Sequence, residues 1–213
     1  MKTDDLISML ATGDSAVTGP GAGSRYAMAG CLGAVAATVM LLLILPLRGD
    51  LLQALWLPMY WVKIGFVASL AGASLFAVLR LSRPGANLDG IALFLTLPVL
   101  AIWAIAAYTL INAESTERAR LFFGDTWTVC PLLIALLSLP VYLAVFRVMQ
   151  DMAPTRPRAA GFAAGLLSGA IAATVYCLHC PEMGAPFIGF WYLLGILVPA
   201  VIGAWQGNTR LRW

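Results

Sequence analysis

Residues 127–146 read WTVCPLLIALLSLPVYLAVF, a run of twenty residues without a charged side chain. A helix needs about twenty apolar residues to cross the hydrocarbon core of a bilayer. Comparable apolar runs occupy residues 26–47, 58–79, 91–111, 160–180 and 187–205. Because a backbone in lipid must satisfy its own hydrogen bonds, the six runs predict an all-α integral membrane bundle of six helices joined by short loops.

The composition agrees with a membrane protein. Hydrophobic residues make up 61% of the chain and charged residues only 11%, against about 25% charged residues in soluble domains. No cleavable signal sequence and no alternating barrel pattern is visible. We expect a tail at 1–25, a six-helix domain at 26–205 and a C-terminal tail at 206–213. This division leaves no room for a soluble catalytic domain, so we expect no enzyme.

Basic residues predict the orientation. The side that carries both tails has Lys2, Arg25, Arg80, Arg83, Arg147, Arg156, Arg158, Arg210 and Arg212, whereas the other side has Arg48, Arg118 and Arg120. The excess of basic residues puts both tails in the cytoplasm of a bacterium, with the chain in the inner membrane and the other loops in the periplasm. The basic residues form no stripe, so no direct nucleic-acid binding is expected. The sequence does not indicate an oligomeric state.

The N-terminal tail offers a surface to a soluble partner. Thr3 can cap a short helix whose apolar residues share one face, and residues 11–24 resemble a flexible tether rich in Gly, Ser and Thr. The stretch is either a frayed terminus or a tethered helix that docks in a groove of a partner. The candidate partner-binding residues are Thr3, Asp4, Asp5, Leu6, Ile7, Met9 and Leu10.

The fifth apolar run carries a stripe of small residues. Gly161, Gly165 and Gly169 recur every four residues, and Ala173 and Cys177 continue the stripe. Small residues at this spacing allow two membrane helices to approach closely. The stripe therefore predicts a close helix crossing, with Cys177 turned toward protein rather than lipid.

Three of the four cysteines are expected at the outer edge of the bundle. Cys130, Cys177 and Cys180 lie at the outer ends of the fourth and fifth runs, together with the only histidine, His179. Cys31, near the inner end of the first run, is expected to be a small buried apolar residue. Because proline is favoured at the start of a helix, Pro131 indicates that Cys130 begins a helix, where the dipole would lower its pKa.

Several interpretations of these residues stay open. Cys130 and Cys180 could form a disulfide, or the thiols and His179 could bind Cu(I) or Zn(II). A redox-active pair and inert buried thiols are the other two interpretations. Lys63 lies about one turn inside the second run. We expect it to extend outward beside Tyr60 and Trp61, although a charge within a bundle is also a functional candidate.

Several segments together resemble one known family. They are MKTDDLI at 1–7, TWTVC at 126–130, LHCPE at 178–182 and LRW at 211–213, in their order around six apolar runs. They resemble the NrsF family of bacterial membrane anti-sigma factors, named as negative regulators of sigma F. The resemblance implies an inner-membrane protein that holds an extracytoplasmic-function sigma factor on its cytoplasmic side.

The resemblance also implies a sensor. Two cysteines, which map onto Cys130 and Cys180, would detect periplasmic stress, typically heavy metal or a redox change. Cys177 has no counterpart in the family pattern. No constitutive cofactor is implied, and copper or another soft ion would act as the signal.

Two other classes of protein are weighed against this one. A quinone-linked thiol oxidoreductase would use Cys177 and Cys180 as its active pair and Cys130 as a relay. Such an enzyme usually needs an exposed pair on a mobile loop, whereas Cys177 lies on the packing stripe. A coupled transporter is disfavoured because the spans lack carboxylates.

Overall fold

The computed structural model describes residues 3, 5, 8, 21–83, 85 and 89–211. Six helices are long and apolar enough to cross a membrane. They are α2 (Ala22–Ile44), α4 (Pro58–Leu81), α5 (Ile91–Asn112), α7 (Cys130–Asp151), α8 (Pro157–Tyr176) and the span Ala185–Arg210. The last span comprises α9 (Ala185–Phe187), the π-helical turn η1 (Ile188–Tyr192) and α10 (Leu193–Arg210). The predicted all-α class and the six spans are confirmed.

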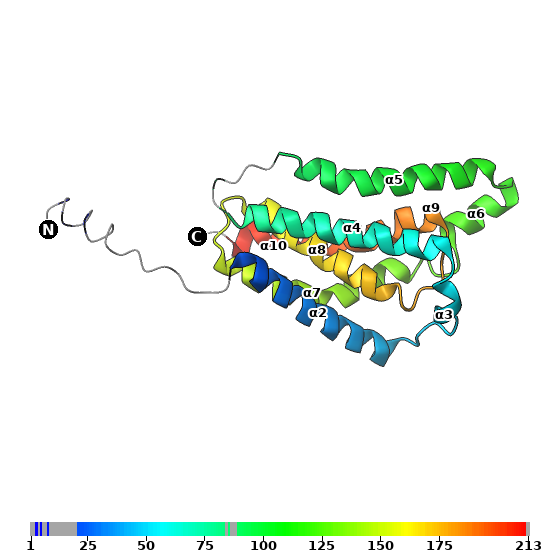
Figure 1. Ribbon diagram of the computed structural model, residues 1–213, viewed down its shortest axis with the longest axis horizontal. Coiled ribbons are helices and arrows are strands. Elements are labelled where there is room, and N and C mark those ends of the chain that lie inside the picture. Colours follow the sequence, from blue (N-terminus) through cyan, green and yellow to red (C-terminus); the bar gives the residue numbers. More distant parts are fainter. Residues whose placement is uncertain are drawn as a thin grey trace.

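The six spans alternate in direction and define two ends of the bundle. The tail end carries the first residues of α2 and the last residues of α4, α7 and α10. The cysteine end carries two short helices, α3 (Leu51–Ala54) and α6 (Ser115–Phe123), and the turn at 177–184. Figure 1 shows α3 and α6 at the end of the molecule opposite the end of α10.

Helix α8 occupies the centre of the bundle. It contacts α2, α4, α7 and α10, and 78% of its most apolar window is buried, against 11% for α5. Figure 1 accordingly shows α5 along one side of the molecule, beside α4. The ends of α8 therefore meet the ends of most other spans.

Glycines allow α8 and α10 to pack with their backbones in contact. A Cβ atom built on Gly161 would lie 2.0 Å from the carbonyl oxygen of Gly203, and one on Gly165 would lie 2.1 Å from that of Pro199. On the facing helix, a Cβ on Gly207 would lie 2.2 Å from the carbonyl oxygen of Pro157. Any larger side chain at these positions would force the two helices apart.

The tail end is held together by a buried polar cluster. The hydroxyls of Tyr26 on α2 and Ser82 after α4 lie 2.8 Å apart, and the Tyr26 hydroxyl donates to Met149 Sδ on α7 at 3.3 Å. Beside this cluster, Arg25 forms an ion pair with Asp151. The first turn of α2 is thus attached to the last turns of α4 and α7.

The described residues at the start of the tail are helical, and the first span exposes its cysteine. Thr3, Asp5 and Ser8 are helical and exposed, with Ser8 Oγ donating to the carbonyl of Asp5 at 3.0 Å. The other candidate partner-binding residues, Asp4, Leu6, Ile7, Met9 and Leu10, lie outside the described residues. Cys31 is exposed on α2 rather than buried, because α2 lies at the rim of the bundle and only one face of it packs inward.

Replacing Gly165 with alanine should destabilise the bundle by about 1–3 kcal/mol, as overpacking does in other cores. Gly72→Ala is the matched control, because a Cβ built on Gly72 meets nothing within 4 Å. The two variants gain the same helix propensity from alanine. Thermal unfolding of the purified protein in detergent should show a lower midpoint for Gly165→Ala alone. Equal midpoints would contradict the backbone contact between α8 and α10.

Candidate functional site

Two helix ends bring Cys130 and Cys180 together at the cysteine end. Cys130 is the first residue of α7, where its backbone N–H donates to the carbonyl of Thr126 at 2.9 Å. Helix α8 ends at Tyr176, and the backbone N–H of Cys180 donates to the carbonyl of that residue at 3.1 Å. A tight turn before Pro181 therefore carries Cys180 back over the end of α8 toward α7.

The sulfurs of Cys130 and Cys180 form one buried thiol site. The two thiols lie next to each other and interact, both side chains are fully buried, and neither forms a disulfide. Cys177 is also buried nearby, but its thiol donates to the carbonyl of Ala173 at 3.2 Å. The interacting pair is therefore Cys130 with Cys180, and not the Cys177 and Cys180 pair that a thiol oxidoreductase would need.

Lys63 on α4 lies inside this site. Its side chain is completely buried, and Nζ donates to the backbone carbonyls of Cys180 at 3.0 Å and Glu182 at 3.1 Å. The ammonium also lies 4.8 Å from the centre of the Tyr192 ring. The expectation that Lys63 extends outward beside Tyr60 and Trp61 is wrong. The carbonyls of the 180–182 turn lie within the bundle end and provide acceptors there.

No carboxylate neutralises Lys63 in the described part of the chain. The ion pairs there are Arg25 with Asp151 and Arg48 with Asp50. The carboxylate of Glu182 accepts from the backbone N–H of Asp125 at 2.8 Å instead. The acidic loop around residues 114–125 therefore supplies a backbone contact to the turn and no counter-ion to Lys63.

Two tyrosines complete the wall of the site. Tyr176 lies beside Cys130, and Tyr192 lies beside Cys180. Both side chains are fully buried, and neither hydroxyl has a hydrogen-bond partner of good geometry among the described residues. Buried hydroxyls without partners are rare, since leaving one unsatisfied costs about 1–3 kcal/mol. These hydroxyls are thus available to donate to whatever negative charge develops on the sulfurs.

The surroundings of Cys180 favour its thiolate. The neighbouring Cys130 thiol lowers the pKa of Cys180 despite its burial, and the charge of Lys63, the Tyr192 hydroxyl and the backbone N–H of Glu182 lower it further. Lys63, which was expected to extend outward, is thus a charged group that acts on this thiol.

His179 does not join the thiols. It is half-buried, and Nδ1 donates to the carbonyl of Pro46 at 2.6 Å in the loop after α2. Arg48 in the same loop donates to the carbonyls of Leu178 and Cys180, each at 3.4 Å. His179 and Arg48 therefore fasten the 178–182 turn to the α2–α3 loop, outside the thiol site.

The donor set limits the chemistry of the site. Among the described residues, no group of three or more His, Cys, Asp or Glu side chains is placed to hold a metal ion. Structural zinc sites use four such ligands. A pair of thiolates suits Cu(I), which prefers soft sulfur ligands, and the same pair can be oxidised to a disulfide.

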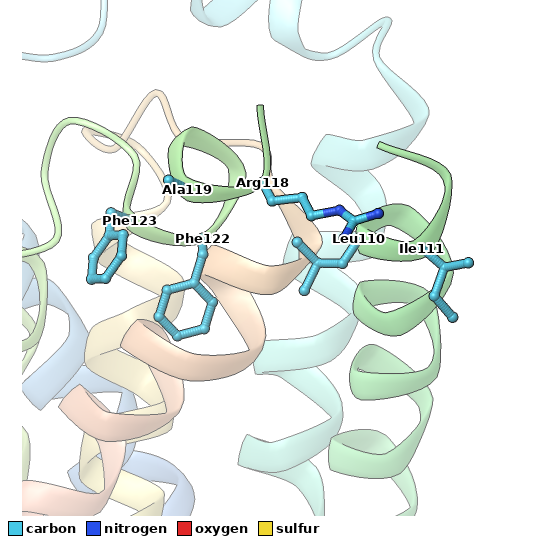
Figure 2. A pocket seen from close by; sticks show the side chains of 6 residues that line it. All are labelled: Leu110, Ile111, Arg118, Ala119, Phe122 and Phe123. Atoms are coloured by element: carbon cyan, nitrogen blue, oxygen red, sulfur yellow. The ribbon is translucent and has the colours of Figure 1, made fainter. Parts of the chain in front are cut away.

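A separate hollow at the cysteine end takes no part in the thiol site. A cavity of about 460 Å³ lies between the end of α5 and helix α6. Figure 2 shows its lining, which is apolar except for one arginine: Leu110, Ile111, Arg118, Ala119, Phe122 and Phe123. None of the lining residues is a cysteine or histidine, and none belongs to the thiol site.

Comparison with known proteins identifies the family. The family model described as "NrsF: Negative regulator of sigma F" matches residues 10–213. A curated protein of Azospira oryzae, named probable anti-sigma-F factor NrsF, is 65% identical over 213 residues, covering all of both chains. The anti-sigma-F factor NrsF of Caulobacter vibrioides is 41% identical over 219 residues, again with both chains fully covered. No solved structure matches. This chain belongs to the NrsF family of negative regulators of sigma F.

Proposed function

We propose that this chain is an inner-membrane anti-sigma factor that holds an extracytoplasmic-function sigma factor at its tail end. It releases that factor when a soft metal ion or an oxidant reaches Cys130 and Cys180. The names of its relatives support the anti-sigma role. The observation that supports the sensing role is the proximity of two buried free thiols from different helix ends, at the end of the bundle opposite the tail.

The orientation follows from the basic residues. With both tails in the cytoplasm, the thiol site faces the periplasm, where metal ions arrive from outside the cell and thiols meet oxidants. The sigma factor is a cytoplasmic protein, so it meets the tail helix and the loops of the tail end. The bundle thus separates the stimulus from the bound partner by the thickness of the membrane.

Helix α7 is the most direct link between the two ends. Its first residue is Cys130, and its last turns carry Met149 and Asp151, which bind Tyr26 and Arg25. These two residues lie in the first turns of α2, directly after the tail. A ligand that draws Cys130 toward Cys180 changes the angle of α7 against α8, and the tail end of α7 then moves relative to α2.

The mechanism requires two arrangements of α7 with different affinity for the signal. A ligand shifts an equilibrium only by its difference in affinity between the two states. A tenfold preference corresponds to about 1.4 kcal/mol. A change in the separation of the two sulfurs is enough to supply that difference, because both sulfurs must reach one small ion at bonding distance.

Replacing either Cys130 or Cys180 with serine should abolish release of the sigma factor by copper, while Cys31→Ser should leave it unchanged. Loss of one thiolate from a two-thiolate site should weaken Cu(I) binding roughly a hundredfold or more, because a hydroxyl is a poor ligand for a soft ion. The double variant should be no worse than either single one, since effects within one site are not additive.

The measurement is the amount of sigma factor that co-purifies with the chain from native membranes, with and without copper, together with a Cu(I) titration of the purified protein. The serine variants should retain the sigma factor under both conditions. Constitutive release by both of them would show that the resting state depends on a bond between the two sulfurs. A full copper response in the double variant would remove the thiol site from the mechanism.

Deleting residues 1–12 should release the sigma factor and leave the bundle folded, because the Gly, Ser and Thr residues before α2 favour a tether that does not depend on the tail. Leu6→Asp with Leu10→Asp is the milder variant, which disrupts the apolar face only. Co-purification should fall to background in both cases, with an unchanged thermal midpoint as the control for folding. If retention of the sigma factor stays complete, the loops of the tail end, and not the tail, make the principal contact.

Removing the hydroxyl of Tyr26 should uncouple the two ends of the bundle. Tyr26→Phe loses its contacts to Ser82 and Met149 but stays far from the thiols, so Cu(I) binding should be unchanged while copper-dependent release is weakened. Tyr108→Phe is the control, because the Tyr108 side chain is 71% exposed on α5. Unaltered release by Tyr26→Phe over a full copper titration would contradict a route through α7 and α2.

A further inference from the structure

Two apolar hollows adjoin along α5 at the cysteine end. The hollow of about 460 Å³ between α5 and α6 lies next to a second one of about 250 Å³, and Leu110 and Phe122 line both. The second hollow is bounded by α5, α9 and η1 and reaches Trp103, which is about 10 Å further along α5 than Leu110 at 1.5 Å per residue. Together they form one apolar channel, the α5 channel, which runs from α6 toward the middle of the span.

A positive charge stands at the α6 end of the α5 channel. Arg118 is the charged residue among the described residues that line it, and Figure 2 shows its side chain extending from α6 toward the end of α5. Its Nε donates to the carbonyl of Ala113 at 3.1 Å. No carboxylate pairs with it in the part of the chain that the structure describes. The terminal nitrogens of the guanidinium therefore keep donors for an anion.

A charged mouth and an apolar interior match the two parts of a phospholipid. Helix α5 has only 11% of its most apolar window buried, so in a membrane hydrocarbon lies against this helix and meets the channel. An acyl chain can fill the apolar part. The phosphate joined to that chain then reaches the guanidinium, which binds phosphate through strong, charge-assisted hydrogen bonds.

The charges around the mouth favour a headgroup that carries both signs. Residues 114–125 contain Glu114, Glu117 and Asp125 against Arg118 and Arg120, a net charge of −1. A headgroup with a net negative charge gains little there. Glu114 precedes Arg118 by four residues, which puts both side chains on one face, and it forms no ion pair among the described residues. An ammonium joined to the phosphate would therefore find a carboxylate beside it.

We propose that the α5 channel binds one zwitterionic phospholipid of the phosphatidylethanolamine class. One acyl chain fills the channel, Arg118 binds the phosphate, and the primary ammonium lies at Glu114. Binding of this lipid involves none of the thiols and does not depend on their role in sensing.

The bound chain packs against the turn that also lines the thiol site. In η1, Gly189 and Phe190 line the channel, whereas Tyr192 lies beside Cys180. The carbonyl of Gly189 accepts from Nε1 of Trp103 at 2.9 Å, so this turn is attached to α5 at the channel wall. An acyl chain in the channel gives the outer side of η1 a packing partner. The lipid therefore stabilises one wall of the thiol site.

The first test measures lipid binding to the full-length protein in detergent by native mass spectrometry, during titration with phosphatidylethanolamine or with phosphatidylglycerol of the same acyl chains. We expect one phosphatidylethanolamine per chain, bound more tightly than phosphatidylglycerol. Arg118→Gln should weaken its binding roughly fivefold, which is the value of one hydrogen bond to a charged group at a partly solvated site. Arg118→Lys should restore part of it.

Two further variants test the partners of the headgroup. Arg120→Gln is the matched control, because it removes the same charge from the same helix without lining the channel, and it should leave binding unchanged. Glu114→Gln should reduce the preference for phosphatidylethanolamine over phosphatidylglycerol. Equal losses in Arg118→Gln and Arg120→Gln would overturn the site, and phosphatidylglycerol bound as tightly as phosphatidylethanolamine by the wild type would overturn the assigned headgroup.

A second test fills the channel. Ala119 lines it, so Ala119→Trp should abolish lipid binding, whereas Thr116→Trp places the same ring on an exposed part of α6 and should not. Because a ligand that binds only the folded state stabilises it, phosphatidylethanolamine should raise the thermal midpoint of the wild type and of Thr116→Trp but not of Ala119→Trp. Equal lipid binding by both tryptophan variants would overturn the proposal, as would a wild type that forms a lipid-free dimer.

Discussion

The close approach of α8 and α10 fixes the position of everything else in this bundle. Membrane helices gain little from hydrophobic burial against each other, so packing must come from close contact. Gly161 and Gly165 provide it by letting backbone meet backbone. Helix α10 lies against one side of α8, and α4, α7 and α2 pack against its other sides. Its final turn is therefore surrounded, and the residues after Tyr176 emerge beside the first residue of α7 and the buried Lys63.

The thiol site is a consequence of how helix ends satisfy their polar groups. The 178–182 turn exposes carbonyls that cannot stay unpaired inside a membrane protein. The side chains of Lys63 and Arg48 donate to the carbonyl of Cys180 in this turn. The backbone N–H of Asp125 donates to the carboxylate of Glu182 at the end of the turn. The same contacts hold Cys180 facing Cys130. The two sulfurs are thus connected to three loops and two helices at once, and the proposed sensing role would use this connection.

The sequence predicted the parts of this structure that depend on periodic patterns. Apolar runs located the six spans within a few residues, and proline after Cys130 indicated a helix start there. The residues that were misplaced depend on tertiary contacts. Lys63 resembled a side chain that extends to the membrane surface, because its acceptors lie more than a hundred positions away in the chain. Cys31 was expected inside because its type is usually buried, but burial depends on which face of α2 meets α7. The partner glycines on α10, Gly203 and Gly207, show the same four-residue spacing as those on α8 and could have been found from it.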